Sequence, residues 1–278
     1  FIFQPAEEAN PHGSGAKAMI DDGLFERFPM DNIFALHNSP GILAGAIATC
    51  SGPMMASTDL FDVTITGKGT HGAFPSGGND PLVIAAQMIT AWQTIISRNI
   101  DAMDHALISA TSINAGNDSW NVIPETAVIR GCVRALSPEI RQQLHDRFHT
   151  ITQSIAEAFD AKVDINYRFM FPVVVNDAEQ TTFVCDVAAD IFGEHCVLRE
   201  RPGQMGSEDF AYMLQKKPGC YFAIGATTPS KDRKGFVGKD IKKTSDLDHF
   251  LAGDVPMLHA PNYDFNDEIL PLGATMFA

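Results

Sequence analysis

The sequence predicts an α/β domain that is interrupted by an inserted α+β domain, and three observations support this fold class. Short apolar runs near both ends of the chain lead directly into polar residues, as strands do at the carboxyl edge of an α/β sheet. Between them, strand and helix patterns follow one another in the order β-α-β-β-α-β. After Pro172 the α/β character returns. We therefore expect residues 1–57 and 171–278 to form one domain and residues 58–170 to form the inserted domain.

The first segment is predicted to contain two strands and a helix. Residues 1–3 are interpreted as a short buried strand, and residues 33–36 as a second strand that ends at His37. A helix is expected over residues 15–22, with Ser14 as its N-cap. Because an apolar start is typical of the middle of a strand, we expect the natural chain to begin upstream of residue 1.

The middle segment combines two periodicities. Alternating apolar and polar residues predict strands, and apolar residues recurring every three or four positions predict helices. The elements are expected near residues 59–66, 81–97, 106–113, 127–133, 138–159 and 163–167. Their order is the ferredoxin-like arrangement, in which two helices cover a four-stranded antiparallel sheet. In the last segment, helices are expected over residues 179–191 and 267–277, and a strand over residues 220–224.

Composition excludes several kinds of partner. The formal net charge of −14 argues against nucleic acid, because phosphate binding needs clustered Lys and Arg. No apolar run reaches the roughly 18 residues that a membrane span needs. The five cysteines are scattered and form no CxxC pair, which indicates reduced thiols. We expect a cytoplasmic protein that binds neither nucleic acid nor membranes.

Carboxylates and histidines follow the apolar runs of the outer segments. Glu7 and Glu8 point in different directions, so one can bind a metal while the other faces a substrate; a pair of surface acids is the alternative. His37 and His259 are each either a hydrogen-bonded structural residue or a ligand. Together these groups suit zinc, manganese or nickel. Their spacing does not show that they converge.

The middle segment carries three further candidates. His71 lies in the glycine-rich loop of residues 67–73, where the backbone can approach a ligand and the imidazole can donate a hydrogen bond. Asn121 precedes a predicted strand, and Arg134 can grip a carboxylate in bidentate fashion. The alternatives are an exposed histidine in a glycine turn and an exposed surface arginine.

Six motifs occur in one order along the chain. They are Gln4-Pro5-Ala6-Glu7-Glu8, Leu36-His37-Asn38-Ser39-Pro40, Gly67-Lys68-Gly69-Thr70-His71-Gly72-Ala73, Asn121-Val122-Ile123-Pro124, Ser207-Glu208-Asp209-Phe210 and His259-Ala260-Pro261-Asn262-Tyr263-Asp264-Phe265-Asn266-Asp267. This combination resembles the M20 metallopeptidase family, and within it the amidohydrolase branch of hippurate, N-acyl-amino-acid and auxin-conjugate hydrolases. The resemblance covers essentially the whole chain. It implies a zinc-peptidase-like catalytic domain interrupted by a ferredoxin-like dimerisation domain.

The resemblance also implies roles for the candidate residues of the outer segments. Glu7 falls on the general base, and Glu8, His37 and His259 fall on metal ligands. In the intact protein these ligands are expected to belong to a site for two divalent ions, with zinc, manganese and nickel as the candidates.

The resemblance assigns the middle segment to substrate handling and dimer formation. His71 matches a residue that reaches the active site of a partner subunit and stabilises the oxyanion. Asn121 and Arg134 match substrate-facing positions. A homodimer formed through the inserted domain is therefore expected.

Two departures from the family pattern affect these expectations. The Cys-Gly-His-Asp-x-His motif, which completes the metal site of family members, is absent from this sequence. The chain is thus expected to be N-terminally truncated and inactive by itself. Pro75-Ser76 also stands where this branch often has Pro-His, which puts any role for a second loop histidine in doubt.

The function implied by the resemblance is metal-dependent hydrolysis of an N-acyl amino acid, such as a hippurate-like amide, to a carboxylic acid and an amino acid. One alternative is an aminopeptidase or dipeptidase of the same fold. Another is a non-catalytic, truncated dimerising paralogue. A Cys-Gly-His-Asp-x-His motif in the coding sequence upstream of Phe1 would favour the enzyme over the paralogue.

Overall fold

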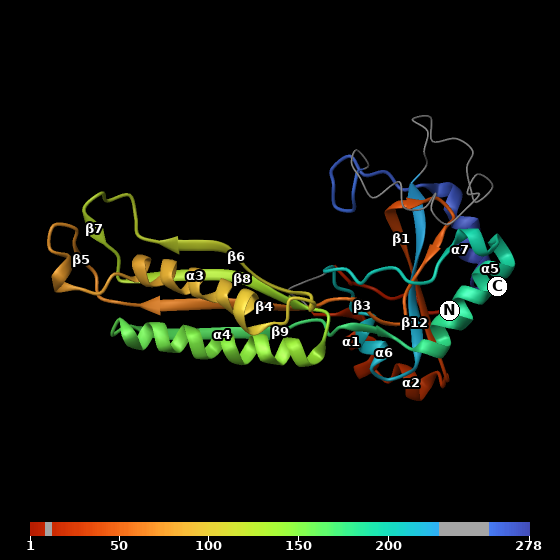
Figure 1. Ribbon diagram of the computed structural model, residues 1–278, viewed down its shortest axis with the longest axis horizontal. Coiled ribbons are helices and arrows are strands. Elements are labelled where there is room, and N and C mark those ends of the chain that lie inside the picture. Colours follow the sequence, from red (N-terminus) through yellow and green to blue (C-terminus); the bar gives the residue numbers. More distant parts are fainter. Residues whose placement is uncertain (9–12, 228–255) are drawn as a thin grey trace. The chain divides into compact units, whose positions relative to one another are not determined.

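The structure is a computed structural model that describes residues 1–8, 13–227 and 256–278 (Figure 1). The chain divides into two compact units. Unit 1 comprises Phe1–Met54, Val174–Gly203 and Glu208–Ala278, and unit 2 comprises Met55–Val173 with Gln204–Ser207. Unit 2 thus interrupts unit 1 in sequence, as an inserted domain does. None of the described helices is long and apolar enough to cross a bilayer.

Unit 1 is built on a four-stranded mixed sheet in the order β1-β12-β2-β11. β1 (Ile33–Leu43) runs parallel to β12 (Gly219–Thr227), and β2 (Ile47–Ala48) runs antiparallel to β12 and parallel to β11 (Val197–Leu198). A separate two-stranded sheet pairs β3 with β10, whose bounds are Gly52–Met55 and Val174–Asn176. The apolar residues of β12 are buried almost completely, which is typical of a strand inside an α/β sheet.

Short helices and one long helix accompany this sheet. The helices of unit 1 are α1 (Gly15–Asp21), α2 (Leu24–Arg27), α5 (Ala178–Phe192), α6 (Ala211–Leu214) and α7 (Leu270–Thr275). Ser14 caps α1 as predicted, since its hydroxyl accepts a hydrogen bond from the backbone N–H of Lys17. Buried residues of α5, including Val184 and Ala188, join the sheet in one hydrophobic core.

Three sequence-based expectations for unit 1 were wrong. Residues 1–3 form no strand, and Phe1 and Phe3 are exposed, because no described strand pairs with their backbone. β1 does not end at His37 but continues to Leu43. The expected terminal helix is divided into a 3-10 turn over Asp267–Ile269 and α7, which has a proline in its first turn.

Unit 2 contains a four-stranded antiparallel sheet in the order β6-β8-β4-β9. Its strands are β4 (Ser57–Thr66), β6 (Ala106–Ala115), β8 (Thr126–Ala135) and β9 (Lys162–Phe169). The helices α3 (Pro81–Asn99) and α4 (Pro138–Ala158) pack side by side along this sheet (Figure 1). This is the ferredoxin-like order that the alternating patterns predicted.

Three large aromatic side chains form the centre of the unit 2 core. The rings of Phe61, Trp92 and Phe148 lie 4.6–5.3 Å apart between centroids, and all three are buried. Gly131 in β8 makes room for this cluster, because a Cβ atom there would lie 2.4 Å from the Phe61 ring. The indole N–H of Trp92 donates to the hydroxyl of Thr152 at 2.9 Å, which joins α3 to α4.

A small second ladder lies beyond the main sheet of unit 2. It pairs β5 (Thr70–His71) with β7 (Val122–Ile123) (Figure 1). Gly69 allows the close approach of the two segments, since a Cβ atom there would lie 3.0 Å from the Ile123 carbonyl oxygen. The two predicted residues His71 and Asn121 are thereby brought to the same end of the unit.

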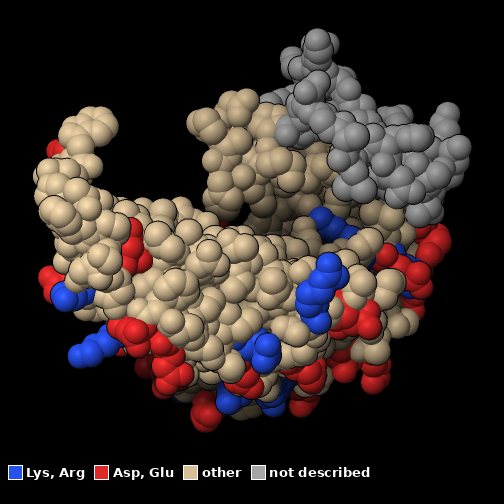
Figure 2. Space-filling view, turned by 60° about the vertical axis from the view of Figure 1, so that its left-hand side comes forward, with Lys and Arg blue, Asp and Glu red and all other residues tan. Residues whose placement is uncertain are grey.

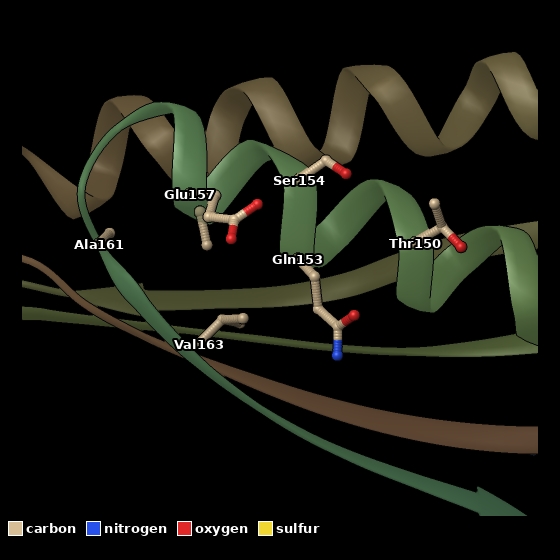
Figure 3. Close-up of a pocket in the computed structure, with 7 residues that line it drawn as sticks. Thr150, Gln153, Ser154, Glu157, Ala161 and Val163 are labelled. Carbon is tan, nitrogen blue, oxygen red and sulfur yellow. The ribbon is translucent and has the colours of Figure 1, made fainter.

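The surface of the described residues carries scattered charges and a shallow hollow. On the face drawn in Figure 2, basic side chains are scattered among acidic ones. A hollow of about 400 Å³ lies between α4 and the start of β9 (Figure 3). Glu157 is the only ionisable residue that lines it, so it offers no catalytic group pair.

Candidate metal and catalytic site

The two ends of unit 1 bring a carboxylate and an imidazole together. An oxygen of Glu8 lies 3.2 Å from Nε2 of His259, although 250 positions separate these residues in the sequence. Both side chains are more than 70% exposed, so the pair is accessible from solvent. Two of the residues predicted as metal ligands therefore meet.

The backbone beside this pair is strained. Ala6 has a φ of 54° and His259 has a φ of 68°, a left-handed conformation that residues other than glycine rarely adopt. Such conformations cost roughly 1–3 kcal/mol each and cluster at functional sites. In unit 1 they occur directly before Glu7 and at His259 itself.

Glu7 is partly buried among other acids. Burial, and then the negative charges of Glu208, Glu8 and Asp209, raise its pKa to about 7, while His37 acts in the opposite direction. A carboxyl group poised near neutrality can accept and return a proton at physiological pH. This is the property that a general base requires.

Glu208 and Asp209 form a buried acidic pair next to Glu7. Burial and the charge of Asp209 raise the pKa of Glu208 to about 7. Glu208 is also hydrogen-bonded to the buried hydroxyl of Tyr221, whose pKa is raised by burial and by this carboxylate. The sequence placed Glu208 and Asp209 in one of the six motifs without a specific role, and it gave no signal for Tyr221 within the apolar run of β12.

Asp209 ties the segment before Glu7 to the rest of unit 1. Its carboxylate accepts hydrogen bonds from the Gln4 amide, from the Ser14 hydroxyl at 2.6 Å and from the Ala16 backbone N–H at 3.0 Å. Because Asp209 is completely buried, these three donors satisfy a charge that would otherwise be costly. The network fixes both segments that flank Glu7 and Glu8.

His37 is held in the tautomer that a metal ligand needs. Its Nδ1 lies 2.6 Å from the carbonyl oxygen of Asn38, which can only accept, so Nδ1 carries the proton. In the neutral imidazole Nε2 then has the lone pair, as in histidines that bind a metal while donating their other N–H to a carbonyl group. The Asn38 amide donates to the hydroxyl of Tyr263, four residues after His259.

The unit 2 candidates His71 and Asn121 also meet. The Ala73 backbone N–H donates to Nδ1 of His71 at 3.1 Å, which places the imidazole proton on Nε2. Nε2 lies 3.1 Å from the side-chain amide nitrogen of Asn121; because Nε2 carries the proton, the amide oxygen must occupy this position for a hydrogen bond to form. This tautomer has one N–H donor, at Nε2, and both residues are exposed.

Arg134 is the next-to-last residue of β8, where it pairs with Thr58 of β4 and Leu107 of β6. Its guanidinium donates to the main-chain carbonyl of Met205 at 2.7 Å, within the short segment Gln204–Ser207 that belongs to this unit. The bond uses one of five guanidinium N–H groups. No described carboxylate forms an ion pair with Arg134, whereas its neighbours Arg130 and Arg141 are paired with Asp62 and Asp59.

The side chains of unit 1 provide the types of donor atom that bind divalent metal ions. Two imidazoles and a carboxylate are a recognised catalytic zinc set, and the acids around Glu7 provide uncompensated negative charge. Within residues 1–8, 13–227 and 256–278, no three His, Cys, Asp or Glu side chains are already arranged to hold an ion. The structure thus joins Glu8 to His259 and orients His37, without assembling all three.

Comparison with known proteins identifies the family. Residues 1–253 match Peptidase family M20/M25/M40, and the chain belongs to this family. The interrupted α/β fold class expected from the sequence is that of solved members.

Three relatives illustrate the similarity. The chain is 36% identical over 277 residues to hippurate hydrolase of Campylobacter jejuni, which covers 99% of this chain and 64% of the relative. It is 41% identical over 224 residues to N-acetyl-L-cysteine deacetylase of Bacillus subtilis, which covers 81% of this chain and 52% of the relative. The crystal structure of Bacillus subtilis YXEP, described as a dinuclear metal-binding peptidase from the M20 family, matches with a TM-score of 0.73 at 27% identity, covering 100% of this chain and 62% of that one. The chain thus spans between 52% and 64% of the length of these relatives.

Proposed function

We propose that the whole protein hydrolyses the amide bond of N-acyl amino acids in a metal-dependent reaction, with hippurate-like compounds as the substrate class. The observation that carries this proposal is the 3.2 Å contact between Glu8 and His259, with Glu7 adjacent to it. Membership of the family and the similarity to hippurate hydrolase and N-acetyl-L-cysteine deacetylase support the same reaction class.

Glu8, His37 and His259 are the residues that would hold divalent metal, and residues outside this chain would complete a site for two ions. Zinc, manganese and nickel all suit such donors. When bound, the metal supplies Lewis acidity and positive charge at the reacting carbonyl group.

Glu7 moves the proton in this proposal. Its carboxylate takes a proton from the attacking water as the water oxygen bonds to the amide carbon. The same carboxyl group then returns the proton to the leaving nitrogen as the C–N bond breaks. A pKa of about 7 suits both steps, because neither protonation state is strongly favoured at neutral pH.

Residues of unit 2 serve the substrate. We assign oxyanion stabilisation to the Nε2–H of His71, which would act on the site of a second subunit in a homodimer formed through unit 2. Asn121 helps to orient that donor, and Arg134 is a candidate for binding the free carboxylate of the amino acid.

A substrate panel separates this proposal from its alternatives. The metal-loaded whole protein is expected to release glycine from N-benzoylglycine and amino acids from N-acetyl amino acids, and to lose this activity when chelated. Dipeptides with a free amino terminus are the matched control substrates. Faster cleavage of the dipeptides would indicate an aminopeptidase or dipeptidase, and no turnover of either set would indicate the non-catalytic paralogue.

A further inference from the structure

A pair of histidines lies on helix α4 of unit 2, outside the proposed reaction site. His145 and His149 are four positions apart, so they lie one turn from each other on the same face of the helix. Their ring centroids are 4.2 Å apart. Because nitrogen–metal bonds are about 2.0–2.1 Å long, one ion can reach both rings at this separation.

Hydrogen bonds leave the same nitrogen free on both rings. Nδ1 of His145 lies 2.9 Å from the Asp146 carboxylate, and Nδ1 of His149 lies 2.9 Å from the His145 carbonyl oxygen. Since both partners only accept, both Nδ1 atoms are donors. A longer 3.5 Å contact from the Gln142 amide to Nδ1 of His145 does not change this, because that amide donates to Asp146 at 2.8 Å.

In the neutral imidazoles both Nε2 atoms therefore carry lone pairs, and neither has a hydrogen-bond partner among the residues that the structure describes. A ring that donates one N–H to a carboxylate or carbonyl group while presenting its other nitrogen is the usual arrangement of a metal-bound histidine. Here the arrangement exists twice, on adjacent turns of one helix.

Aromatic side chains pack against both imidazole rings, and the positive charge of the arginine one turn earlier is already paired. His145 packs edge-on against Tyr167 at 4.9 Å, and His149 contacts the same ring at 5.5 Å. Arg141, one turn before His145, is neutralised by the buried carboxylate of Asp59. The side chain of His145 remains 25% exposed, so the pair is partly accessible to solvent.

We propose that His145 and His149 bind a single divalent transition-metal ion through their Nε2 atoms, with water completing its coordination. Imidazole nitrogens and the order of affinities for first-row metals favour Cu²⁺, followed by Ni²⁺ and Zn²⁺. This site belongs to unit 2 and uses none of the residues assigned to amide hydrolysis. The metal-binding proposal can therefore be tested separately from the proposed function.

The background protein for the test carries Glu8→Ala, His37→Ala and His259→Ala, which remove the other proposed metal ligands. Titrating this protein with Cu²⁺ alone tests whether His145 and His149 bind an ion. We expect one equivalent of Cu²⁺ to bind, with hyperfine structure from two imidazole nitrogens in its electron paramagnetic resonance spectrum. Adding His145→Gln or His149→Gln is expected to weaken binding by about tenfold or more. His105→Gln removes an exposed histidine of the same unit and is the matched control, which should bind as before.

Thermal unfolding in chelator checks that each variant remains folded. A second measurement needs no substitution at the pair: in the nuclear magnetic resonance spectrum, substoichiometric Cu²⁺ should broaden the signals of residues 142–152 before all others. Equal Cu²⁺ affinity in the background protein and in both glutamine variants would overturn the proposal. Broadening centred elsewhere would overturn it as well.

Discussion

Burial and like charge act together on single carboxyl groups of unit 1. Glu7 and Glu208 both have a pKa raised to about 7, in each case chiefly by burial. A carboxyl group with a folded-state pKa above its unfolded value contributes its full stability below the unfolded pKa, near 4.5. That stability is lost as the pH rises through the folded pKa, because the folded protein must then bury a charge.

The substitution Glu208→Gln is therefore expected to stabilise the metal-free protein at pH 8 relative to pH 5. The difference should be on the order of 2 kcal/mol, since one pKa unit corresponds to about 1.4 kcal/mol and the neighbouring acids share the effect. Thermal unfolding of both proteins at the two pH values measures it. The exposed Glu26→Gln is the control, and equal gains at pH 5 and pH 8 would contradict the role of the buried charge.

At the scale of elements, the two helices of unit 2 are joined by one buried polar contact. The indole of Trp92 on α3 donates to Thr152 on α4, and both side chains are fully buried. The Thr152 hydroxyl in turn donates to the Phe148 carbonyl at 2.6 Å. A buried donor deprived of its acceptor costs more than an ordinary hydrogen bond contributes.

Thr152→Val keeps the shape of the side chain but leaves the Trp92 N–H without an acceptor. We expect it to lower the free energy of unfolding by about 1–3 kcal/mol in urea denaturation. Thr150→Val makes the same change at an exposed position of α4 and should stay within roughly 0.5 kcal/mol of the parent. Equal losses in the two variants would show that helix propensity, not the buried contact, is responsible.

Strands and helices were predicted correctly where a single hydrophobic periodicity runs through the whole element. The strands and helices of unit 2 follow alternation and helical spacing because one face of each packs on a single core. β1 was predicted to end at His37, since the apolar run of residues 33–36 stops there. In the structure β1 is the edge strand next to β12, where a proline without an N–H is tolerated.

The sequence named candidate site residues but could not show which of them meet. Motifs of the family pointed to Glu7, Glu8, His37 and His259, yet only the folded chain brings Glu8 to His259. Tyr221 gave no signal because its position in an apolar strand conceals the hydroxyl that reaches Glu208. Contacts between residues far apart in sequence depend on tertiary packing, which periodicity does not encode.

At the scale of the whole molecule, the proposed reaction site draws on residues of two subunits. With its proton on Nε2, His71 is a donor suited to an oxyanion; it belongs to unit 2, whereas Glu7 belongs to unit 1. We propose that a homodimer supplies it to the partner's reaction site.

Mixing full-length His71→Ala and Glu7→Gln proteins tests this sharing. Each variant alone should be nearly inactive. After subunit exchange, half of the dimers contain one site with both residues intact, so activity should recover to about a quarter of the parent value. Mixing Glu7→Gln with Glu8→Ala, which disable the same site, is the control that should not recover. No recovery after verified exchange would remove the role of His71 in the partner's site.

The central claim is that Glu7 is the general base and Glu8 is a metal ligand. Substituting each of them separately in the full-length protein tests this claim most directly. Glu7→Gln should reduce the rate of N-acyl amino acid hydrolysis by on the order of 10²–10⁴-fold while metal content stays near that of the parent, because only proton transfer is lost. Glu8→Gln should lower the metal content itself, because a ligand is lost. Metal analysis alongside kcat measures both, with Glu26→Gln as the control. Equal metal loss in Glu7→Gln and Glu8→Gln would contradict the assignment of Glu7 as the base and Glu8 as the ligand.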